Sequence, residues 1–268
     1  MYKLRDWIDI NKLDWNGLSL NPNAIELLSE NQDKIDWYHL PENPNAIDLL
    51  QQKSDKIHWD FLSINPNAIH ILEKNVEKIN WKWLSVNRNA IHLLENNLDK
   101  IDWWNLSQNS SAIRILENNP NKINWCGLST NPNAIQLLEK NMDKIDWNYL
   151  SANSNAIHLL EKNMDKIYWK YLSMNPNAIH LLKKNIDKID WWYLSKNSSA
   201  ISILEDNFDK IVLMMLSRNP SIFELDYEAI KKQCSIFKEE LIQVALHPSR
   251  IQKLLDHGIC IGDLDNYI

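Results

Sequence analysis

Four histidines share one position of a repeated stretch, and they could in principle bind a metal. They form two pairs spaced by 22 residues within each pair: His70 and His92, then His158 and His180. Zinc needs ligand atoms about 2 Å away, whereas equivalent residues of stacked helices lie about 8–10 Å apart. No cysteine or carboxylate at a fixed spacing completes a ligand set, and the three cysteines are dispersed along the chain. We therefore expect no metal and no cofactor.

Lysine and tryptophan recur in rows that could bind nucleic acid. Lysine occurs every 22 residues from Lys12 to Lys210, and tryptophan does so from Trp15 to Trp191. Spaced lysines can neutralise phosphates, and rows of aromatic rings can stack on bases. However, Asp or Glu precedes the lysine in eight of the ten repeats, which predicts a nearly neutral row of paired charges. The tryptophans are expected in the core, because each short repeat needs a large apolar residue to bury.

Catalytic machinery is not visible in the sequence. We find no nucleophile with a base at a recognisable spacing and no glycine-rich phosphate loop, and the whole chain has only four glycines. Such loops and residue pairs are the usual signs of an active site. We therefore expect that the protein is not an enzyme.

The residues that vary between repeats are the better candidates for binding, because the recurring residues serve packing. The two positions after the tryptophan vary freely and are often aromatic or lysine. Exposed Tyr and Trp beside Lys are typical of protein-recognition surfaces. The candidate partner-binding residues are Phe61, Trp83, Trp104, Tyr149, Lys170, Tyr171, Trp192 and Tyr193.

Three of these candidates are expected to form a row. Tyr149, Tyr171 and Tyr193 occupy one position in three successive repeats, so stacking of the repeats would place them in a line about 20 Å long. Such a row could anchor a helix or an extended peptide. The alternative is that these side chains lean over the neighbouring repeat and serve packing alone.

All of these positions belong to one repeating unit. Its skeleton is D-K-I-D-W-x-x-L-S-x-N-P-N-A-I-x-L-L-E-K-N-x, repeated without insertion from Asn11, with Leu213 in the last tryptophan position. A rigid period of this length is typical of a solenoid, in which each unit buries its apolar face against its neighbours.

Two short helices fit inside each repeat. In the third repeat, Asn65 before Pro66 predicts an N-cap, and Ala68, Ile69, Ile71 and Leu72 form the buried face of the second helix. Asn75 is expected in a left-handed C-terminal conformation. The first helix, around residues 57–63, has so few residues that part of it could be 3₁₀. A leucine-rich-repeat strand is disfavoured, because valine and threonine are scarce and Pro or Ser precedes a helical apolar pattern.

The expected organisation is one elongated array with dissimilar ends. Residues 1–10 are interpreted as an N-terminal cap, in which Leu4, Trp7 and Ile8 have the spacing of one helical face. Residues 11–230 are ten repeats. Residues 231–268 are interpreted as a degenerate repeat that caps the core, with Leu241–Pro248 in place of W-x-x-L-S-x-N-P.

Composition fits an intracellular soluble protein. Hydrophobic residues make up 44% and charged residues 24% of the chain, and no secretory signal, membrane span or disulfide framework is visible. The net charge of −6 argues against a dominant role in binding polyanions. The oligomeric state is left open.

The repeat, together with the tail F-K-E-E-L-I-x-x-A-L-H-P-S-R-I-x-K-L-L-D at Phe237–Asp256, resembles a family of repeat proteins encoded by giant nucleocytoplasmic DNA viruses. The resemblance covers nearly the whole chain and implies a viral origin, with a location in the host cytoplasm or the virion. It brings no activity with it. More distantly, L-S-x-N-P is similar to the leucine-rich variant repeat, in which α- and 3₁₀-helices alternate in a right-handed superhelix.

The expected fold is thus an all-α, right-handed α-solenoid of short two-helix repeats with caps at both ends. The expected function is a non-catalytic scaffold for protein–protein interaction, without membrane contact. The alternative is a nucleic-acid-binding solenoid that uses the lysine row and the varied aromatic residues.

Overall fold

The structure, a computed structural model, describes residues 1–245 and 247–256. The chain divides into two compact units. One comprises Leu4–Phe223, and the other comprises Met1–Lys3 together with Glu224–Ile268. The first unit contains the repeats and is built almost entirely of short helices, which confirms the expected all-α repeat fold. Among the described residues, no helix is long and apolar enough to cross a membrane.

The first helix of most repeats begins at the tryptophan position, which Leu213 occupies in the tenth repeat. These tryptophan helices are α1 (Trp15–Ser19), α4 (Trp59–Ile64), α6 (Trp81–Leu84), α8 (Trp103–Gln108), α10 (Trp125–Thr130), α12 (Trp147–Leu150), α14 (Trp169–Leu172), α16 (Trp191–Ser195) and α18 (Leu213–Ser217). The second repeat has Pro41 in the serine position and forms only the 3₁₀ helix η4 (Leu40–Glu42). In the other repeats the helix is α-helical, so the 3₁₀ character that the sequence left open for this element is found in the second repeat.

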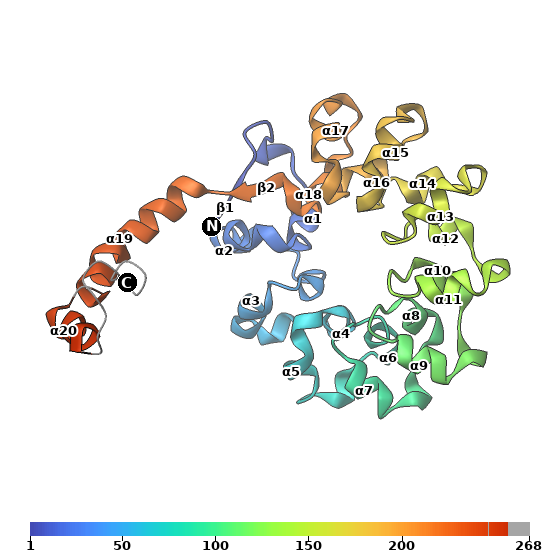
Figure 1. Ribbon diagram of the computed structural model, residues 1–268, viewed down its shortest axis with the longest axis horizontal. Helices are drawn as coiled ribbons and strands as arrows, with labels where there is room; N and C mark the ends of the chain where they lie inside the picture. Colours follow the sequence, from blue (N-terminus) through green and yellow to red (C-terminus); the bar gives the residue numbers. More distant parts are fainter. Residues whose placement is uncertain (246, 257–268) are drawn as a thin grey trace. The chain divides into compact units, whose positions relative to one another are not determined.

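The second helix of repeats 1 to 9 begins at the isoleucine of A-I-x-L-L. These isoleucine helices are α2 (Ile25–Glu30), α3 (Ile47–Gln52), α5 (Ile69–Leu72), α7 (Ile91–Glu95), α9 (Ile113–Asn118), α11 (Ile135–Glu139), α13 (Ile157–Glu161), α15 (Ile179–Lys183) and α17 (Ile201–Glu205). Figure 1 shows α5, α9, α15 and α17 on the outer side of the curved array, and α4, α8, α16 and α18 on its inner side.

A 3₁₀ turn at the D-K pair joins each repeat to the next, as in η7 (Val76–Lys78) and η13 (Ile186–Lys188). Several P-N-A segments also form a 3₁₀ turn before the isoleucine helix, as in η6 (Pro66–Ala68). The expectation of two helices per repeat therefore omitted these 3₁₀ turns. Asn65 caps this turn as predicted, because its Oδ1 accepts a hydrogen bond from the Asn67 amide.

Asn75 does not adopt the expected left-handed conformation. Its φ is −138° and its ψ is 49°. Its Nδ2 donates to the carbonyl of Ile71 at 2.9 Å, so the asparagine satisfies a C-terminal carbonyl of the helix through its side chain instead.

The core runs through the repeats as one continuous cluster of leucine, alanine and isoleucine. In the third repeat Leu62, Ala68 and Leu72 are fully buried, while Ile69 and Ile71 pack partly buried against them. The tryptophans are also half-buried and pack against this cluster. We expected the tryptophans in the core, and they lie at its margin.

Buried serine and asparagine side chains join neighbouring repeats. Ser107 Oγ donates to the Trp103 carbonyl and accepts a bond from the Asn124 amide of the next repeat. Asn131 Nδ2 donates to the Ser107 and Asn109 carbonyls of the preceding repeat, at 3.0 and 2.9 Å. A buried polar group is stabilising only when it is hydrogen-bonded, so these side chains fix the register between repeats.

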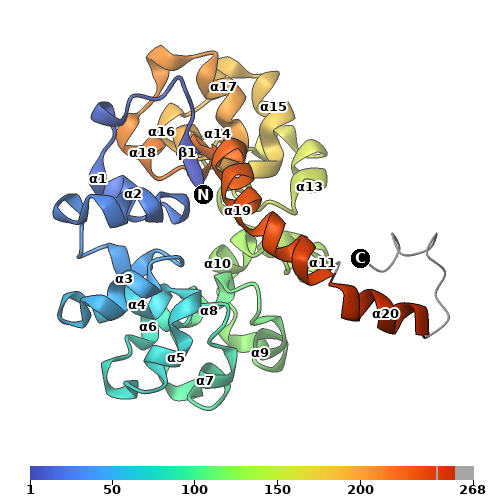
Figure 2. The same ribbon diagram turned by 90° about the vertical axis from the view of Figure 1, so that its left-hand side faces the viewer.

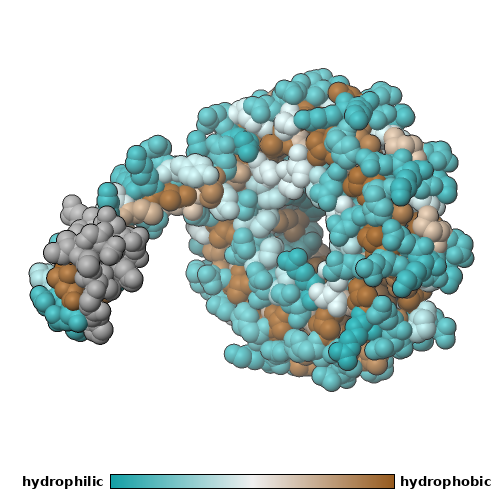
Figure 3. Space-filling model, in the orientation of Figure 1, coloured by the Kyte–Doolittle hydropathy of each residue, from teal (hydrophilic) through white to brown (hydrophobic). Residues whose placement is uncertain are grey.

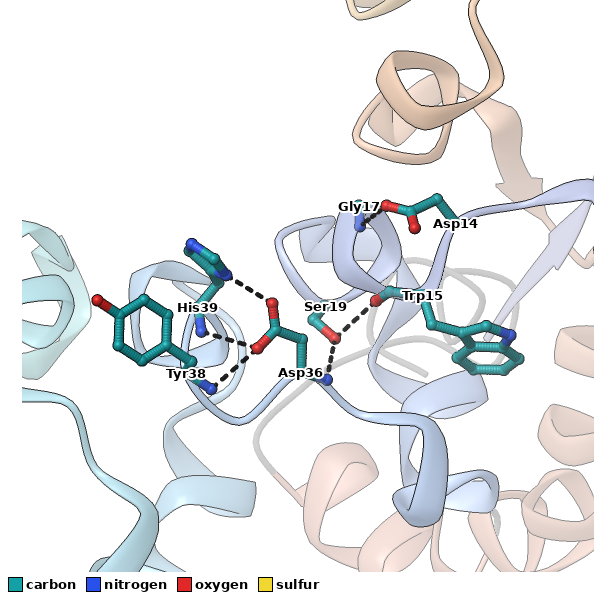
Figure 4. A network of polar contacts seen from close by, with 7 residues as sticks. All are labelled: Asp14, Trp15, Gly17, Ser19, Asp36, Tyr38 and His39. Atoms are coloured by element: carbon teal, nitrogen blue, oxygen red, sulfur yellow. Dashed lines mark hydrogen bonds and ion pairs between the residues drawn. The ribbon is translucent and has the colours of Figure 1, made fainter.

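The junction between the first and second repeats shows how one repeat holds the start of the next (Figure 4). Ser19 Oγ donates to the Trp15 carbonyl and accepts a bond from the Asp36 amide. The Asp36 carboxylate then accepts bonds from the amides of Tyr38 and His39 and contacts the His39 ring. Serine therefore anchors the start of the next repeat, and the aspartate accepts hydrogen bonds from the backbone amides that follow it.

The array closes on itself, because the tenth repeat contacts the first as if the two were consecutive. The Asp14 amide donates to Ser217 Oγ at 2.8 Å, as the Asp36 amide does to Ser19 Oγ. Asn21 Nδ2 donates to the Ser217 and Asn219 carbonyls, both at 2.9 Å.

In an ordinary junction the asparagine donates to the carbonyls 24 and 22 residues earlier, as Asn131 does. Asn21 has partners at the same two spacings once ten periods of 22 residues, or 220 residues, are added to its number. Figures 1 and 2 both show α1 beside α18. Residues 4–223 therefore form a closed ring of repeats, and the space-filling view shows a hollow near its centre (Figure 3).

Ring closure changes the role expected for the ends of the array. An open solenoid needs caps because its terminal repeats expose apolar faces, but here the first and tenth repeats cover each other. Residues 4–10 lie along the tenth repeat: the Arg5 amide donates to the Ile222 carbonyl at 3.0 Å, and Arg5 Nε donates to the Ser221 carbonyl at 2.7 Å. The helical spacing of Leu4, Trp7 and Ile8 was misleading, since residues 2–4 form a strand.

The second unit begins where the tenth repeat loses its isoleucine helix. Strand β2 (Phe223–Leu225) takes its place in the sequence and pairs with β1 (Tyr2–Leu4). Helix α19 (Tyr227–Ala245) and helix α20 (Pro248–Asp256) follow. Leu241–Ala245 thus ends a long helix and does not form a short repeat-like one. The expected cap over residues 231–268 stays a prediction, and residues 246 and 257–268 lie outside the described part.

Candidate partner-binding surface

The structure brings the three predicted tyrosines together. The ring centroids of Tyr149 and Tyr171 are 5.7 Å apart, and those of Tyr171 and Tyr193 are 5.8 Å apart. Tyr168 adds an edge-to-face contact to Tyr171 at 5.0 Å. The row arises because α12, α14 and α16 carry tyrosine at the same position of stacked helices. We call Tyr149, Tyr171 and Tyr193 the tyrosine row.

The tyrosine row is half-buried, and its position explains why. Side chains two residues after the tryptophan point toward the preceding repeat: Asn105 Nδ2, for example, donates to the Lys82 carbonyl at 3.0 Å. The tyrosines therefore pack between repeats and also present part of their rings to solvent. Burial raises the pKa of the Tyr171 phenol, and the neighbouring phenols of Tyr149 and Tyr193 add to the rise.

Exposed tryptophan and lysine extend this surface. Trp192 follows Trp191 in α16 and is 43% exposed. Lys170 is exposed, and its Nζ lies 5.5 Å from the ring centroid of Tyr193. Trp83 and Trp104 are also exposed, at 36% and 41%, on α6 and α8. In the described part of the chain, no ring contact links these two residues to the tyrosine row.

Phe61 belongs to a separate aromatic cluster. Its ring lies 5.1 Å from Tyr38, 4.9 Å from His39 and 5.0 Å from His58 between centroids. The eight predicted residues are therefore divided: Tyr149, Lys170, Tyr171, Trp192 and Tyr193 form one surface, and the other three lie on earlier repeats.

The lysine row has partners other than those predicted from the sequence. Seven of the lysines place Nζ over the tryptophan ring of the preceding repeat, 4.3–4.9 Å from the ring centroid: Lys34, Lys78, Lys100, Lys144, Lys166, Lys188 and Lys210. The expected pairing with the preceding Asp or Glu is wrong for these residues. An ammonium group over an indole face is attracted by the ring quadrupole, so the row links neighbouring repeats.

The histidine row pairs with glutamates of the preceding isoleucine helices. His92 Nε2 lies 2.8 Å from Glu73 Oε1, His158 Nε2 lies 3.0 Å from Glu139 Oε1, and His180 Nε2 lies 2.9 Å from Glu161 Oε1. All three pairs are exposed. Within residues 1–245 and 247–256 no group of three or more metal-ligating side chains occurs.

Cys126 has no environment that would activate a thiol. Its Sγ lies 3.4 Å from Asp146 Oδ2. Burial raises the pKa of this thiol, and the neighbouring carboxylate raises it further. A reactive cysteine needs a lowered pKa, so this geometry disfavours the thiolate form of Cys126.

A cavity of about 410 Å³ lies at the contact between the tenth and first repeats. We call this contact the seam. Repeats 9 and 10 contribute Trp192, Tyr193, Lys196 and Arg218 to the cavity, and the first two repeats contribute Asp14 and His39. Burial lowers the pKa of the Lys196 ammonium, and the charge of Arg218 lowers it further. This cavity continues from the end of the tyrosine row at Tyr193.

Sequence reasoning missed the seam cavity, although one signal was present. Lys196 and Arg218 stand five positions after the tryptophan position in consecutive repeats, where most other repeats carry an apolar residue such as Leu20, Ile64 or Val86. Nothing in the sequence indicated that residues of repeats 9 and 10 would meet residues of the first two repeats.

Comparison with other proteins adds no relative. No protein-family model, curated protein or solved structure matches the chain. The fold and the side-chain geometry are therefore the basis for a functional proposal.

Proposed function

We propose that the protein is a non-catalytic scaffold that binds a segment of a partner protein on the tyrosine row and the adjacent Trp192. The observation that carries this proposal is the contiguous line of Tyr149, Tyr171 and Tyr193, extended by an exposed tryptophan and Lys170. Rigid aromatic side chains bury a large area at a small entropic cost, and they carry much of the energy of protein interfaces.

The closed ring supports this use of the surface. Buried asparagine side chains bond neighbouring repeats, and buried serine side chains do so wherever the repeat carries serine, as between repeats 5 and 6, so the aromatic side chains stand on a preorganised backbone. A preorganised surface loses less conformational freedom when a partner binds. An intracellular location and a viral origin remain proposals that rest on the resemblance of the repeat.

Nucleic acid is the alternative ligand, and the structure weakens the argument for it. The lysine row was its main support, but seven of these lysines lie over tryptophan rings of the frame. Their charges still face solvent, so single-stranded oligonucleotides belong in the binding test as competitors.

The test is a peptide-display selection on the purified full chain. We expect enrichment of peptides whose binding is lost in the Trp192→Ala variant and retained in Tyr227→Ala. Tyr227 is the matched control, because it is 72% exposed and belongs to the other compact unit. If no peptide is enriched, or if enriched peptides bind Trp192→Ala as well as the parent, the proposal is wrong.

A further inference from the structure

Three cationic side chains surround the end of the tyrosine row. Lys170 Nζ and Lys196 Nζ lie 5.5 and 5.4 Å from the ring centroid of Tyr193. Arg218 lines the seam cavity together with Lys196, Trp192 and Tyr193. The chain as a whole has a net charge of −6, so this group of positive charges is opposite in sign to the net charge of the protein.

No carboxylate forms an ion pair with these three cations among residues 1–245 and 247–256. The acidic residues nearby have other partners. Asp14 lines the cavity, but its Oδ2 accepts the Gly17 amide at 2.8 Å. Asp190 Oδ1 likewise accepts the Tyr193 amide at 3.1 Å. Glu42 acts on Arg218 at longer range, and burial raises the pKa of that carboxyl.

Because Lys196 is partly buried, a negative charge bound beside it would be stabilised. The cost of partly removing Lys196 from water falls when an opposite charge lies beside it. Beside the cations, Met214 and Met215 line the same cavity with Trp192. The site therefore offers an apolar wall and a pair of cations, which suits an acidic side chain with an apolar neighbour.

We propose that the seam cavity receives an acidic residue of the bound protein segment between Lys196 and Arg218, with an adjacent apolar residue against Trp192 and Met214. This inference rests on the proposed function and adds that the partner segment is acidic. A carboxylate matches the fork of donors on arginine and the ammonium of lysine. An oligonucleotide carries a charge on every nucleotide and is disfavoured, because the cavity offers one pair of cations, Lys196 and Arg218, beside the Asp14 carboxylate.

The test compares the composition of the peptides that are enriched on the parent and on variants. We expect the parent to enrich peptides with Asp or Glu beside an apolar residue. The Lys196→Met, Arg218→Met double variant should lose this preference. The control variant Lys183→Met, Lys184→Met removes the same charge from exposed residues at the end of α15, and it should keep the preference.

A titration then measures the contribution of the charges. For an enriched acidic peptide we expect affinity to fall about tenfold or more in the double variant, and also when the peptide's Glu is replaced by Gln. The double variant should melt close to the parent, because Arg218 is exposed and Lys196 is half-exposed. A melting curve checks this before binding is compared.

The outcomes separate this inference from the proposed function. If peptides are enriched through Trp192 but are not acidic, the acidic partner is wrong and the scaffold function stands. If no peptide is enriched, the proposed function fails, and this inference fails with it. If a ten-nucleotide oligo(dT) binds more tightly than any enriched peptide and needs Lys196 and Arg218, nucleic acid is the ligand and the acidic peptide is wrong.

Discussion

The junction between repeats 5 and 6 and the seam between repeats 10 and 1 are built from the same contacts, but only the junction is also crossed by the chain. In the junction, Asn131 Nδ2 donates to Ser107 and Asn109. At the seam, Asn21 Nδ2 donates to Ser217 and Asn219. Each contact also has a glycine two residues after the tryptophan, Gly127 in the junction and Gly17 at the seam.

This comparison teaches that the repeat itself determines the geometry of an interface, while chain connectivity determines what happens when the interface breaks. Repeats 5 and 6 stay joined after their contact is lost. Repeats 10 and 1 can separate, which leaves two complementary faces on one open chain. Such faces can pair with those of other copies, since a head-to-tail contact need not close within one molecule.

The largest expected effect is that of a bulky residue at the seam glycine. A Cβ at Gly17 would lie 2.7 Å from Ser217 Cβ and 2.8 Å from the Met214 carbonyl oxygen, and both distances are too short. We expect Gly17→Leu to open the ring and to produce concentration-dependent dimers or larger assemblies. Light scattering coupled to gel filtration measures the mass.

Gly127→Leu is the matched control, because a Cβ there would lie 2.6 Å from the Trp104 carbonyl oxygen. We expect this variant to melt at a lower temperature but to stay monomeric, since its ring ends still pair. If both variants stay monomeric, or if both assemble alike, the seam does not open as a separate step.

The next prediction concerns how the ring divides on unfolding. Trp103→Ala removes a half-buried indole from the middle of the array, which should cost about 3–5 kcal/mol. In the closed ring we expect a single unfolding transition, because breaking one contact leaves the remaining repeats stacked in one arc. In the Gly17→Leu background the same change should divide an open arc and give two transitions.

Denaturant titration followed by circular dichroism distinguishes these cases. Gly17→Leu alone is the control for the double variant. Two transitions for Trp103→Ala in the closed ring would show that closure does not couple the two halves.

A smaller effect is expected from the asparagine side chains. Asn131→Ala and Asn21→Ala each remove two hydrogen bonds to buried carbonyls, at a cost of about 1–3 kcal/mol. We expect Asn131→Ala to lower the free energy of global unfolding by this amount. For Asn21→Ala the loss should appear mainly as faster hydrogen exchange of seam amides such as Asp14. Equal changes in global unfolding for both variants would contradict this difference.

The smallest expected effect on stability is that of replacing the lysine of the D-K pair, which differs between an ordinary junction and the seam. Lys188 Nζ lies 4.7 Å from the Trp169 ring centroid. The repeat that precedes Lys12 across the seam is the tenth, which has Leu213 in the tryptophan position. Lys188→Met should therefore cost about 0.5–1 kcal/mol, and Lys12→Met should leave the melting temperature unchanged. If the two variants shift the melting temperature equally, the lysine contributes through something other than the indole.

Particular residues show how far the candidate site could be predicted. Tyr149, Tyr171 and Tyr193 were predicted as a row because they share one repeat position, and their rings do contact one another. The sequence could not show that they also pack between helices, since burial depends on the distance between repeats. Lys196 and Arg218 were missed because their partners in the seam cavity come from the other end of the array.

Local chemistry determined the fold within one repeat. Asn65 and Pro66 start the P-N-A turn, and Leu62, Ala68 and Leu72 are fully buried, because capping and helical spacing act within a few residues. Only the tertiary structure decided that the array closes. Ten repeats close when each turns by about 36° on average, and this small rotation depends on how each pair of repeats packs. The rotation cannot be read from the 22-residue pattern. A difference of a few degrees per repeat would add up over ten repeats, and the Asp14 amide would then not reach Ser217 Oγ.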